Sequence, residues 1–199
     1  MGETEERLVW LAKTGDREAF SELVVLFESK VYRAAYALTG NEHDAKDLSQ
    51  ETFVRAFKGI GRFRGKSSFF TWLYRILLNT FKSWVRKRCK MPQASWEALE
   101  GAAQGNSGST SALISSAASQ RETVNRTYKA ISALPDEQKM AIALHCLEEM
   151  TYREIAEVMR CSIGTVKSRI HAGRLALKRQ LLSPDTRGEQ QGGTRKNEV

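Results

Sequence analysis

Residues 55–90 read RAFKGIGRFRGKSSFFTWLYRILLNTFKSWVRKRCK and hold 11 Lys and Arg without one Asp or Glu. Because the whole 199-residue chain has a net formal charge of +8, this segment more than accounts for the positive charge of the protein. It also holds eight aromatic side chains, namely Phe57, Phe63, Phe69, Phe70, Trp72, Tyr74, Phe81 and Trp84. Cations interleaved with flat rings suit a surface that holds a phosphate backbone and stacks on unpaired bases.

Buried rings beneath a solvated basic face are the simpler alternative for this segment. Burial tendencies favour a core position for most of the rings taken one at a time. A solvated face, however, normally mixes charges of both signs. A run of this length without acids therefore indicates a polyanionic partner.

A helix is expected over residues 71–88, where side chains of one kind recur at steps of three and four. One face, called here the first basic stripe, consists of Trp72, Arg75, Asn79, Lys82 and Arg86. The adjoining face is more apolar and carries Leu73, Leu77, Thr80 and Trp84. The loop IGRFRGK before it, residues 60–66, contains glycines that let it bend tightly and approach a ligand. We expect this helix and loop to grip partly opened nucleic acid.

Composition restricts the class of protein. The positive charge favours a nucleic-acid partner, although an anionic membrane is also compatible with it. No apolar run approaches the roughly 18 residues of a membrane span, and the acidic start is unlike a signal peptide. The three cysteines, Cys89, Cys146 and Cys161, show no CxxC spacing, which predicts a reduced, cytoplasmic protein. His145 and Cys146 have no second ligand pair at usable spacing, so neither a metal nor a cofactor is expected.

The first 30 residues are acidic, with 7 Asp and Glu against 4 Lys and Arg. Apolar residues recur at helical steps on both sides of Thr14-Gly15-Asp16, which predicts two helices with Asp16 capping the second. A further helix is expected from about Val31 to Gly40-Asn41, a usual helix stop.

The next helix is expected over residues 43–57, HDAKDLSQETFVRAF. Its inward stripe is Ala45, Leu48, Thr52 and Ala56. Asp47, Gln50, Glu51 and Val54 fall together on another side, called here the acidic face. A polar face is usually just solvated, but this one directly precedes an acid-free segment. We therefore expect the two faces to serve different partners.

Residues 91–122 are mostly Ala, Ser, Gly, Gln and Asn and predict a flexible linker, because they bury too little to offset the entropy of ordering. The chain then divides into a first domain over 1–90, the linker, a second domain over 123–182 and a disordered tail over 183–199. With no strand-like alternation, the fold class is all-α, with two small helical domains.

The second domain has the spacing of a helix-turn-helix. The run Thr151-Tyr152-Arg153-Glu154 resembles a capping box and opens a short helix. A turn at residues 160–162 leads to a second helix with Val166, Ile170, Gly173, Leu177 and Leu181 on its inner face. Lys167, His171, Arg174 and Lys178 form an outward stripe, called here the second basic stripe. Residues 161–182 hold five Lys and Arg and no acid, the charge that a helix entering the major groove requires.

Two segments resemble the signatures of the bacterial sigma-70 family, in its extracytoplasmic-function (ECF) branch. DAKDLSQETFVRAF at 44–57, FRG at 63–65 and TWLYRI at 71–76, with Asn79, resemble region 2. Leu134-Pro135, YREIA at 152–156 and GTVKSR at 164–169 resemble region 4. The resemblance implies a dissociable initiation subunit, without catalysis of its own, that directs core RNA polymerase to promoters.

The resemblance also assigns roles to residues. Positions matching those that dock on the clamp coiled coil of the polymerase are Asp47, Gln50, Glu51 and Val54. The −10 element, with a flipped base, would be bound by Arg62, Phe63, Arg64, Lys66, Phe69, Trp72, Arg75, Asn79, Lys82 and Arg86. The −35 element would be bound by Thr165, Lys167, Ser168, Arg169, His171, Arg174 and Lys178. Region 4 would also pack on the polymerase flap. The expected regulator is an anti-sigma protein. The factor is expected to be monomeric when free of polymerase.

Two positions depart from the family pattern. Ala172 stands where the family usually has Arg or Lys, which removes a base or phosphate contact of about 1–3 kcal/mol. Arg160 stands where the turn often has Gly, so a left-handed backbone there would cost about 1 kcal/mol.

Two other classes of protein fit parts of the sequence. A helix-turn-helix repressor or activator would bind an operator and use residues 1–90 for dimerisation or sensing, but this leaves the acid-free aromatic segment without a role. A nucleic-acid enzyme would need a cluster of metal-binding carboxylates beside the basic face. Asp44, Asp47 and Glu51 lie on a helix that docking explains better.

Overall fold

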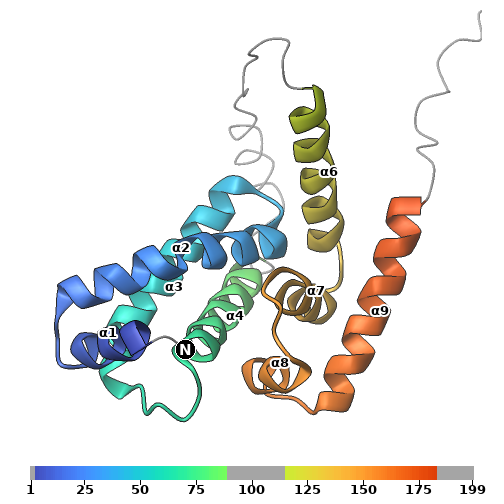
Figure 1. The fold of residues 1–199 in the computed structure, drawn as a ribbon. Coiled ribbons are helices and arrows are strands. Elements are labelled where there is room, and N and C mark those ends of the chain that lie inside the picture. The colour runs from blue at the N-terminus through green and yellow to red at the C-terminus, as the bar shows by residue number, and fades with distance from the viewer. Residues whose placement is uncertain (1–2, 89–114, 183–199) are drawn as a thin grey trace, which may run out of the picture.

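The computed structural model describes residues 3–88 and 115–182, and every regular element in these two ranges is a helix (Figure 1). The all-α class predicted from the sequence is confirmed. The predicted linker residues 91–114 and the predicted tail, residues 183–199, lie outside the described residues.

The first two helices, α1 (Glu3–Lys13) and α2 (Arg17–Thr39), are separated by a tight turn. Gly15 has φ +102°, a left-handed conformation that side chains disfavour. Asp16 then caps α2, because Oδ1 of its side chain accepts hydrogen bonds from the backbone N–H groups of Glu18 and Ala19 at 2.9 and 3.1 Å. This break and its cap are as predicted.

The prediction of a separate helix from Val31 is wrong, because α2 runs unbroken to Thr39. The residues between the two predicted helices, 28–30, include neither Gly nor Pro, so nothing there ends a helix. Phe27 and Val31, four residues apart, are both buried on the same side of α2. The helix ends where predicted, at Gly40, whose φ is 71° and whose N–H donates to the carbonyl of Tyr36 at 2.8 Å.

Helix α3 (Glu42–Gly59) lies between α2 and α4 (Phe69–Arg88) and completes the first bundle. Its predicted inward stripe is confirmed, since Ala45, Leu48, Thr52 and Ala56 are all buried. A short 3-10 turn, η1 (Ile60–Arg62), and an irregular loop of residues 63–68 then lead into α4.

The second bundle consists of α6 (Ser115–Ser132), α7 (Asp136–Ile142), a π-helical turn η2 (Ala143–Leu147), α8 (Tyr152–Met159) and α9 (Ile163–Leu182). Helix α6 begins earlier than expected, so residues 115–122, predicted as linker, are helical. Composition did not show this because a stretch rich in Ala, Ser and Gln is compatible with an exposed helix as well as with a coil.

The helix-turn-helix of α8 and α9 forms as predicted. The backbone N–H of Thr151 donates to the Glu154 carboxylate at 2.8 Å, and the Thr151 hydroxyl accepts from the Glu154 N–H at 3.3 Å. Arg160 ends α8 with φ 53°, the left-handed conformation expected for that turn. On α9, Val166, Ile170 and Gly173 are buried. Leu181, predicted on the inner face, is 43% exposed, since the last turns of α9 project past α7 (Figure 1).

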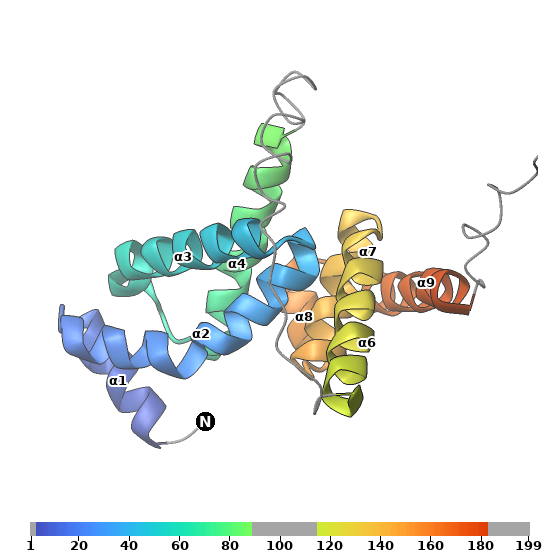
Figure 2. The same cartoon turned by 90° about the horizontal axis from the view of Figure 1, so that it is seen from above.

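The two bundles pack against each other. Helix α2 lies against α6, and α4 lies against α8 (Figure 2). The Tyr36 and Tyr128 rings meet edge to face with centroids 5.1 Å apart. Gly40 lies so close to Ser132 that a Cβ atom on Gly40 would overlap the Ser132 side chain.

Candidate nucleic-acid and partner-binding surfaces

The acidic face lies on the exposed side of α3, as its spacing predicted. Asp47, Gln50, Glu51 and Val54 are all exposed. Within α3, Asp47 lies 3.3 Å from the His43 ring and Glu51 lies 2.6 Å from Arg55. Exposed pairs of this kind contribute only about 0.3–0.5 kcal/mol. A partner's cations could therefore replace them at little cost.

An apolar hollow of about 640 Å³ lies beside the acidic face, between α2 and α3. Val24, Tyr32 and Phe53 line it, together with Gln50 and Val54 of the acidic face. Two neighbouring side chains of α2, Val25 and Leu26, are 69% and 50% exposed. The sequence does not indicate this hollow, because its walls come from two different helices.

The aromatic rings of the acid-free segment are mostly core, as their individual burial tendencies indicated. Phe63, Phe69, Tyr74 and Phe81 are buried, and Trp72 packs on the first two at centroid distances of 5.1 and 5.5 Å. Phe57 is 44% exposed. The rings fix the loop and α4 in place more than they present stacking surfaces.

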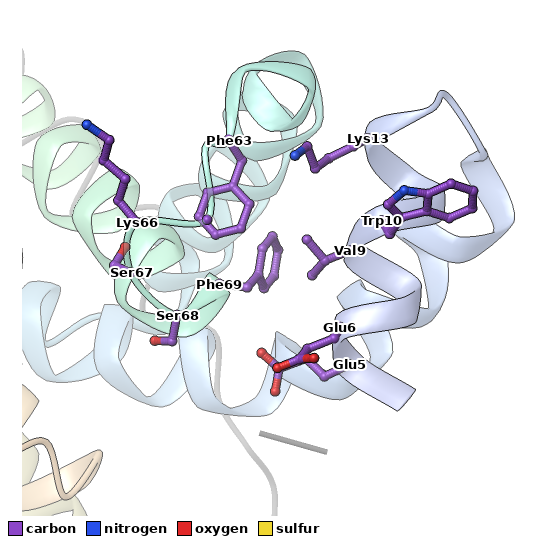
Figure 3. A pocket seen from close by; sticks show the side chains of 11 residues that line it. Glu5, Glu6, Val9, Trp10, Lys13, Phe63, Lys66, Ser67, Ser68 and Phe69 are labelled. Atoms are coloured by element: carbon purple, nitrogen blue, oxygen red, sulfur yellow. The ribbon is translucent and has the colours of Figure 1, made fainter. Parts of the chain in front are cut away.

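The loop before α4 borders a pocket of about 480 Å³ (Figure 3). Phe63 and Phe69 from the loop side and Val9 from α1 form its apolar wall. Lys13 of α1 points toward Phe63, and Lys66 of the loop extends outward on the other side of that ring. Glu5 and Glu6 line the pocket farther along α1 from Lys13. Gly65, with φ +66°, lets the loop turn along the rim.

Helix α1 is the part of this pocket that sequence reasoning missed. Its Trp10 lines the pocket and is 63% exposed. The signal available in the sequence was a Trp within a segment rich in charged residues. One oxygen of Glu5, Oε1, is buried without a hydrogen-bond partner among the described residues.

The first basic stripe divides into exposed and contacted members. Asn79 and Arg86 are exposed, and neither is among the residues that line the pocket beside the loop. Arg75 is half-buried and donates through Nη2 to the backbone carbonyl of Glu157 at 3.2 Å. Lys82 lies 3.4 Å from Glu137. Arg62, Arg64 and Lys66, in η1 and the loop, are exposed.

The second basic stripe is confirmed on α9. Lys167, His171, Arg174 and Lys178 are all exposed. Ser168 is also exposed, while Thr165 is half-buried beside the Ser162 hydroxyl at 2.9 Å. Arg169 points elsewhere, since its side chain is 25% exposed and its guanidinium lies 2.9 Å from Glu137. This leaves the three cations Lys167, Arg174 and Lys178 on one open face of the helix-turn-helix, together with His171 and Ser168.

Among the described residues, no three His, Cys, Asp or Glu are grouped as a metal ion would require. The helices in these ranges also include none with the length and apolar character to cross a membrane. Two helical bundles, a basic helix-turn-helix and a basic helix beside a glycine-containing loop together define a two-domain DNA-binding protein.

Comparisons with known proteins identify the family. Residues 23–90 match the family model of sigma-70 region 2, and residues 125–177 match that of sigma-70 region 4. The ECF RNA polymerase sigma factor SigW of Bacillus subtilis is 36% identical over 177 residues, which cover 85% of this chain and 92% of SigW. The chain therefore belongs to the ECF branch of the sigma-70 family, and it is a sigma factor of transcription initiation.

Solved structures agree with this family. The sigma factor RpoE of Bartonella quintana, in complex with the anti-sigma factor NepR, is 27% identical with a TM-score of 0.62, covering 81% of this chain and 96% of that one. CnrH, in complex with the cytosolic domain of CnrY, shares the fold with a TM-score of 0.66 at 24% identity, covering 90% and 97% of the two chains. Because the similarity extends through both domains, a repressor with a separate sensor domain is not favoured.

Proposed function

We propose that this sigma factor binds core polymerase and promoter DNA through three separate surfaces. The acidic face of α3 docks on the clamp coiled coil of core RNA polymerase. The loop and the first basic stripe bind the melted −10 element, and the second basic stripe binds the −35 element. The observation that carries the proposal is the separation of charge, since an exposed acidic surface and two acid-free basic surfaces occupy different helices.

The acidic face suits a protein partner better than DNA. Its carboxylates would repel phosphates, while the apolar hollow beside it offers area for burial. An anti-sigma protein is the expected competitor for this surface, in line with the complex of RpoE with the anti-sigma factor NepR. We expect the factor to be cytoplasmic, to be monomeric away from polymerase and to have no catalytic activity of its own.

The loop and the first basic stripe, called here the −10 surface, suit a single strand with unstacked bases. Melting costs a few kcal/mol per base step, so a pocket that rewards a flipped base is required. The pocket beside the loop has an apolar wall and two lysines at its rim. Asn79, exposed on α4, supplies an amide that can donate to and accept from a base edge. On α9, Lys167 and Arg174 are placed to hold the duplex of the −35 element.

Two variants test this division of surfaces. Asp47→Ala with Gln50→Ala should weaken binding to core polymerase, measured by competition for core against the unmodified factor. Asn79→Ala should leave that affinity unchanged and reduce open complexes, measured by permanganate reactivity of promoter thymines.

The matched controls are Glu22→Ala, an exposed acid on α2, and Gln180→Ala, an exposed amide on α9. Both controls should behave as the unmodified factor does. If the α3 double variant and Asn79→Ala fail at the same step, the proposed division is wrong.

A further inference from the structure

Trp10 of α1 is a large aromatic side chain that takes no part in the core. Leu8, Val9 and Ala12 are buried and hold α1 in place, whereas Trp10 is 63% exposed. Among the described residues, its indole makes no ring contact and no hydrogen bond with another side chain. Single exposed apolar side chains are common on protein surfaces, so the meaning of this one depends on what surrounds it.

Trp10 adjoins the loop that the proposed function assigns to the −10 element. It lines the same pocket of about 480 Å³ as Phe63 and Phe69. Those two rings are buried, and the Trp10 ring extends from α1 on the side away from them (Figure 3). Trp10 therefore offers an open aromatic face just beyond the pocket, where a second base could stack.

Unpaired cations lie on the elements around this pocket. Lys46 of α3 lies 2.8 Å from Glu42, within its own helix. By contrast, four exposed cations of α1, η1 and the loop form no ion pair with another described residue, namely Lys13, Arg62, Arg64 and Lys66. They can attract phosphates without first breaking an internal pair.

The charges of α1 determine where a strand can cross this helix. Glu6, Trp10 and Lys13 recur at steps of four and three, so they follow one side of α1. At a rise of about 1.5 Å per residue, Trp10 lies about 4.5 Å from Lys13 and about 6 Å from Glu6 along the axis. Glu5 and Glu6 would repel phosphates, and Lys13 would attract them. A strand that leaves the loop should therefore cross α1 near Trp10 and Lys13.

We propose that α1 extends the −10 surface. The melted strand continues from the loop across α1, where Trp10 stacks on a base next to the one held in the pocket and Lys13 binds a phosphate. The inference rests on the proposed function of the loop. It assigns DNA contacts to a helix that lies outside residues 23–90, the range matched by the region 2 family model. Because stacking tolerates every base, Trp10 adds affinity for the strand and little sequence preference.

The test uses holoenzyme and two templates made from a promoter that run-off transcription has mapped. The fork template is duplex through the −35 element and single-stranded from the −10 element onward, and the second template lacks the single-stranded part. Trp10→Ala should weaken binding to the fork template by at least about fivefold, the loss of one stacked base. It should change binding to the duplex template by less than twofold. Trp10→Phe should keep most of the affinity, because a smaller ring still stacks.

The dependence of binding on salt tests Lys13 separately. Lys13→Ala should lower the slope of log affinity against log salt by about 0.7 on the fork template, the value for one phosphate of a single strand. Lys129→Ala, which removes an exposed lysine of α6, is the matched control and should leave the slope unchanged. Trp10→Ala should also leave it unchanged, because a neutral ring releases no counterion.

Abasic sites placed one at a time along the single strand locate the stacked base. At one position, loss of the base should weaken binding of the unmodified factor as much as Trp10→Ala does. At that position it should weaken binding of the variant no further, because the two changes remove the same contact.

The inference is overturned if Trp10→Ala weakens binding to both templates equally, or if no abasic position removes the difference between the variant and the unmodified factor. Arg64→Ala, in the loop, separates this failure from failure of the proposed function. If Arg64→Ala weakens binding to the fork template and Trp10→Ala does not, the proposed −10 surface stands and its extension to α1 is wrong. If neither variant weakens that binding, the proposed −10 surface is itself contradicted.

Discussion

Glu148 makes the packing of the two domains depend on pH. Its side chain is 1% exposed and lies between Arg33 of α2 and the buried ring of Tyr74 on α4. Burial raises the pKa of the Glu148 carboxyl above 4.5, although Tyr74, Arg33 and Lys30 oppose the shift. Burial likewise raises the pKa of Tyr74 and of Tyr128 on α6, so both phenols stay neutral in this interface.

The sign of the effect follows from this direction. A carboxyl whose pKa is raised in the packed form binds a proton more tightly there than in the unfolded chain. The stabilisation gained from that proton is fully present below about pH 4.5 and is lost as pH rises through the raised pKa. One proton limits the change to about 1.4 kcal/mol per pH unit.

Glu148→Gln removes this dependence, because the amide is neutral at every pH. The variant should be the more stable form at pH 7.5, and its advantage should shrink as pH falls to 5.0. For a chain of this length, about 1 kcal/mol corresponds to roughly 2–4 °C in Tm, so thermal unfolding at the two pH values resolves the difference. Glu149→Gln controls for the loss of an acid. Parallel pH dependence of the unmodified factor and Glu148→Gln would refute the reasoning.

Three further predictions concern the second domain. Thr151→Ala removes the capping box with Glu154 and should cost about 1 kcal/mol in the free energy of unfolding, measured by urea denaturation. Gly173→Ala places a Cβ 2.7 Å from Cγ1 of the buried Ile142. Overpacking there costs about 1–3 kcal/mol, and the better helix propensity of Ala returns about 1 kcal/mol. The free energy of unfolding should therefore fall by up to about 2 kcal/mol in the same assay. Lys167→Ala should reduce the slope of log affinity against log salt by about 1 when holoenzyme binds promoter duplex, and an unchanged slope would show that Lys167 makes no phosphate contact.

The sequence predicted the helix ends that depend on contacts between residues close together in the chain. Asp16, Gly40 and Thr151 begin or end helices through contacts within four residues, so their roles were visible in the sequence. The prediction that a helix starts near Val31 was wrong, because an apolar repeat by itself does not mark where a helix begins. Leu181 was misplaced because its helical spacing continues beyond the end of the neighbouring helix that would bury it.

The contacts between domains could not be predicted in this way. Arg75 and Glu157 are 82 residues apart in the chain, and neither the spacing nor the composition of their segments indicates that they meet. The surfaces of α3 and α9 followed from helical periodicity, because each lies on a single helix. The pocket beside the loop required α1, which contributes one wall from a distant segment.

The most direct test of the central claim is co-purification with core RNA polymerase followed by run-off transcription from a library of genomic fragments. A sigma factor of this design should bind core and produce new, discrete start sites that share two conserved elements upstream. In the same experiment, the double variant Asp47→Ala with Gln50→Ala should co-purify with less core polymerase and give fewer transcripts. Tight binding to duplex DNA with no affinity for core would contradict the account.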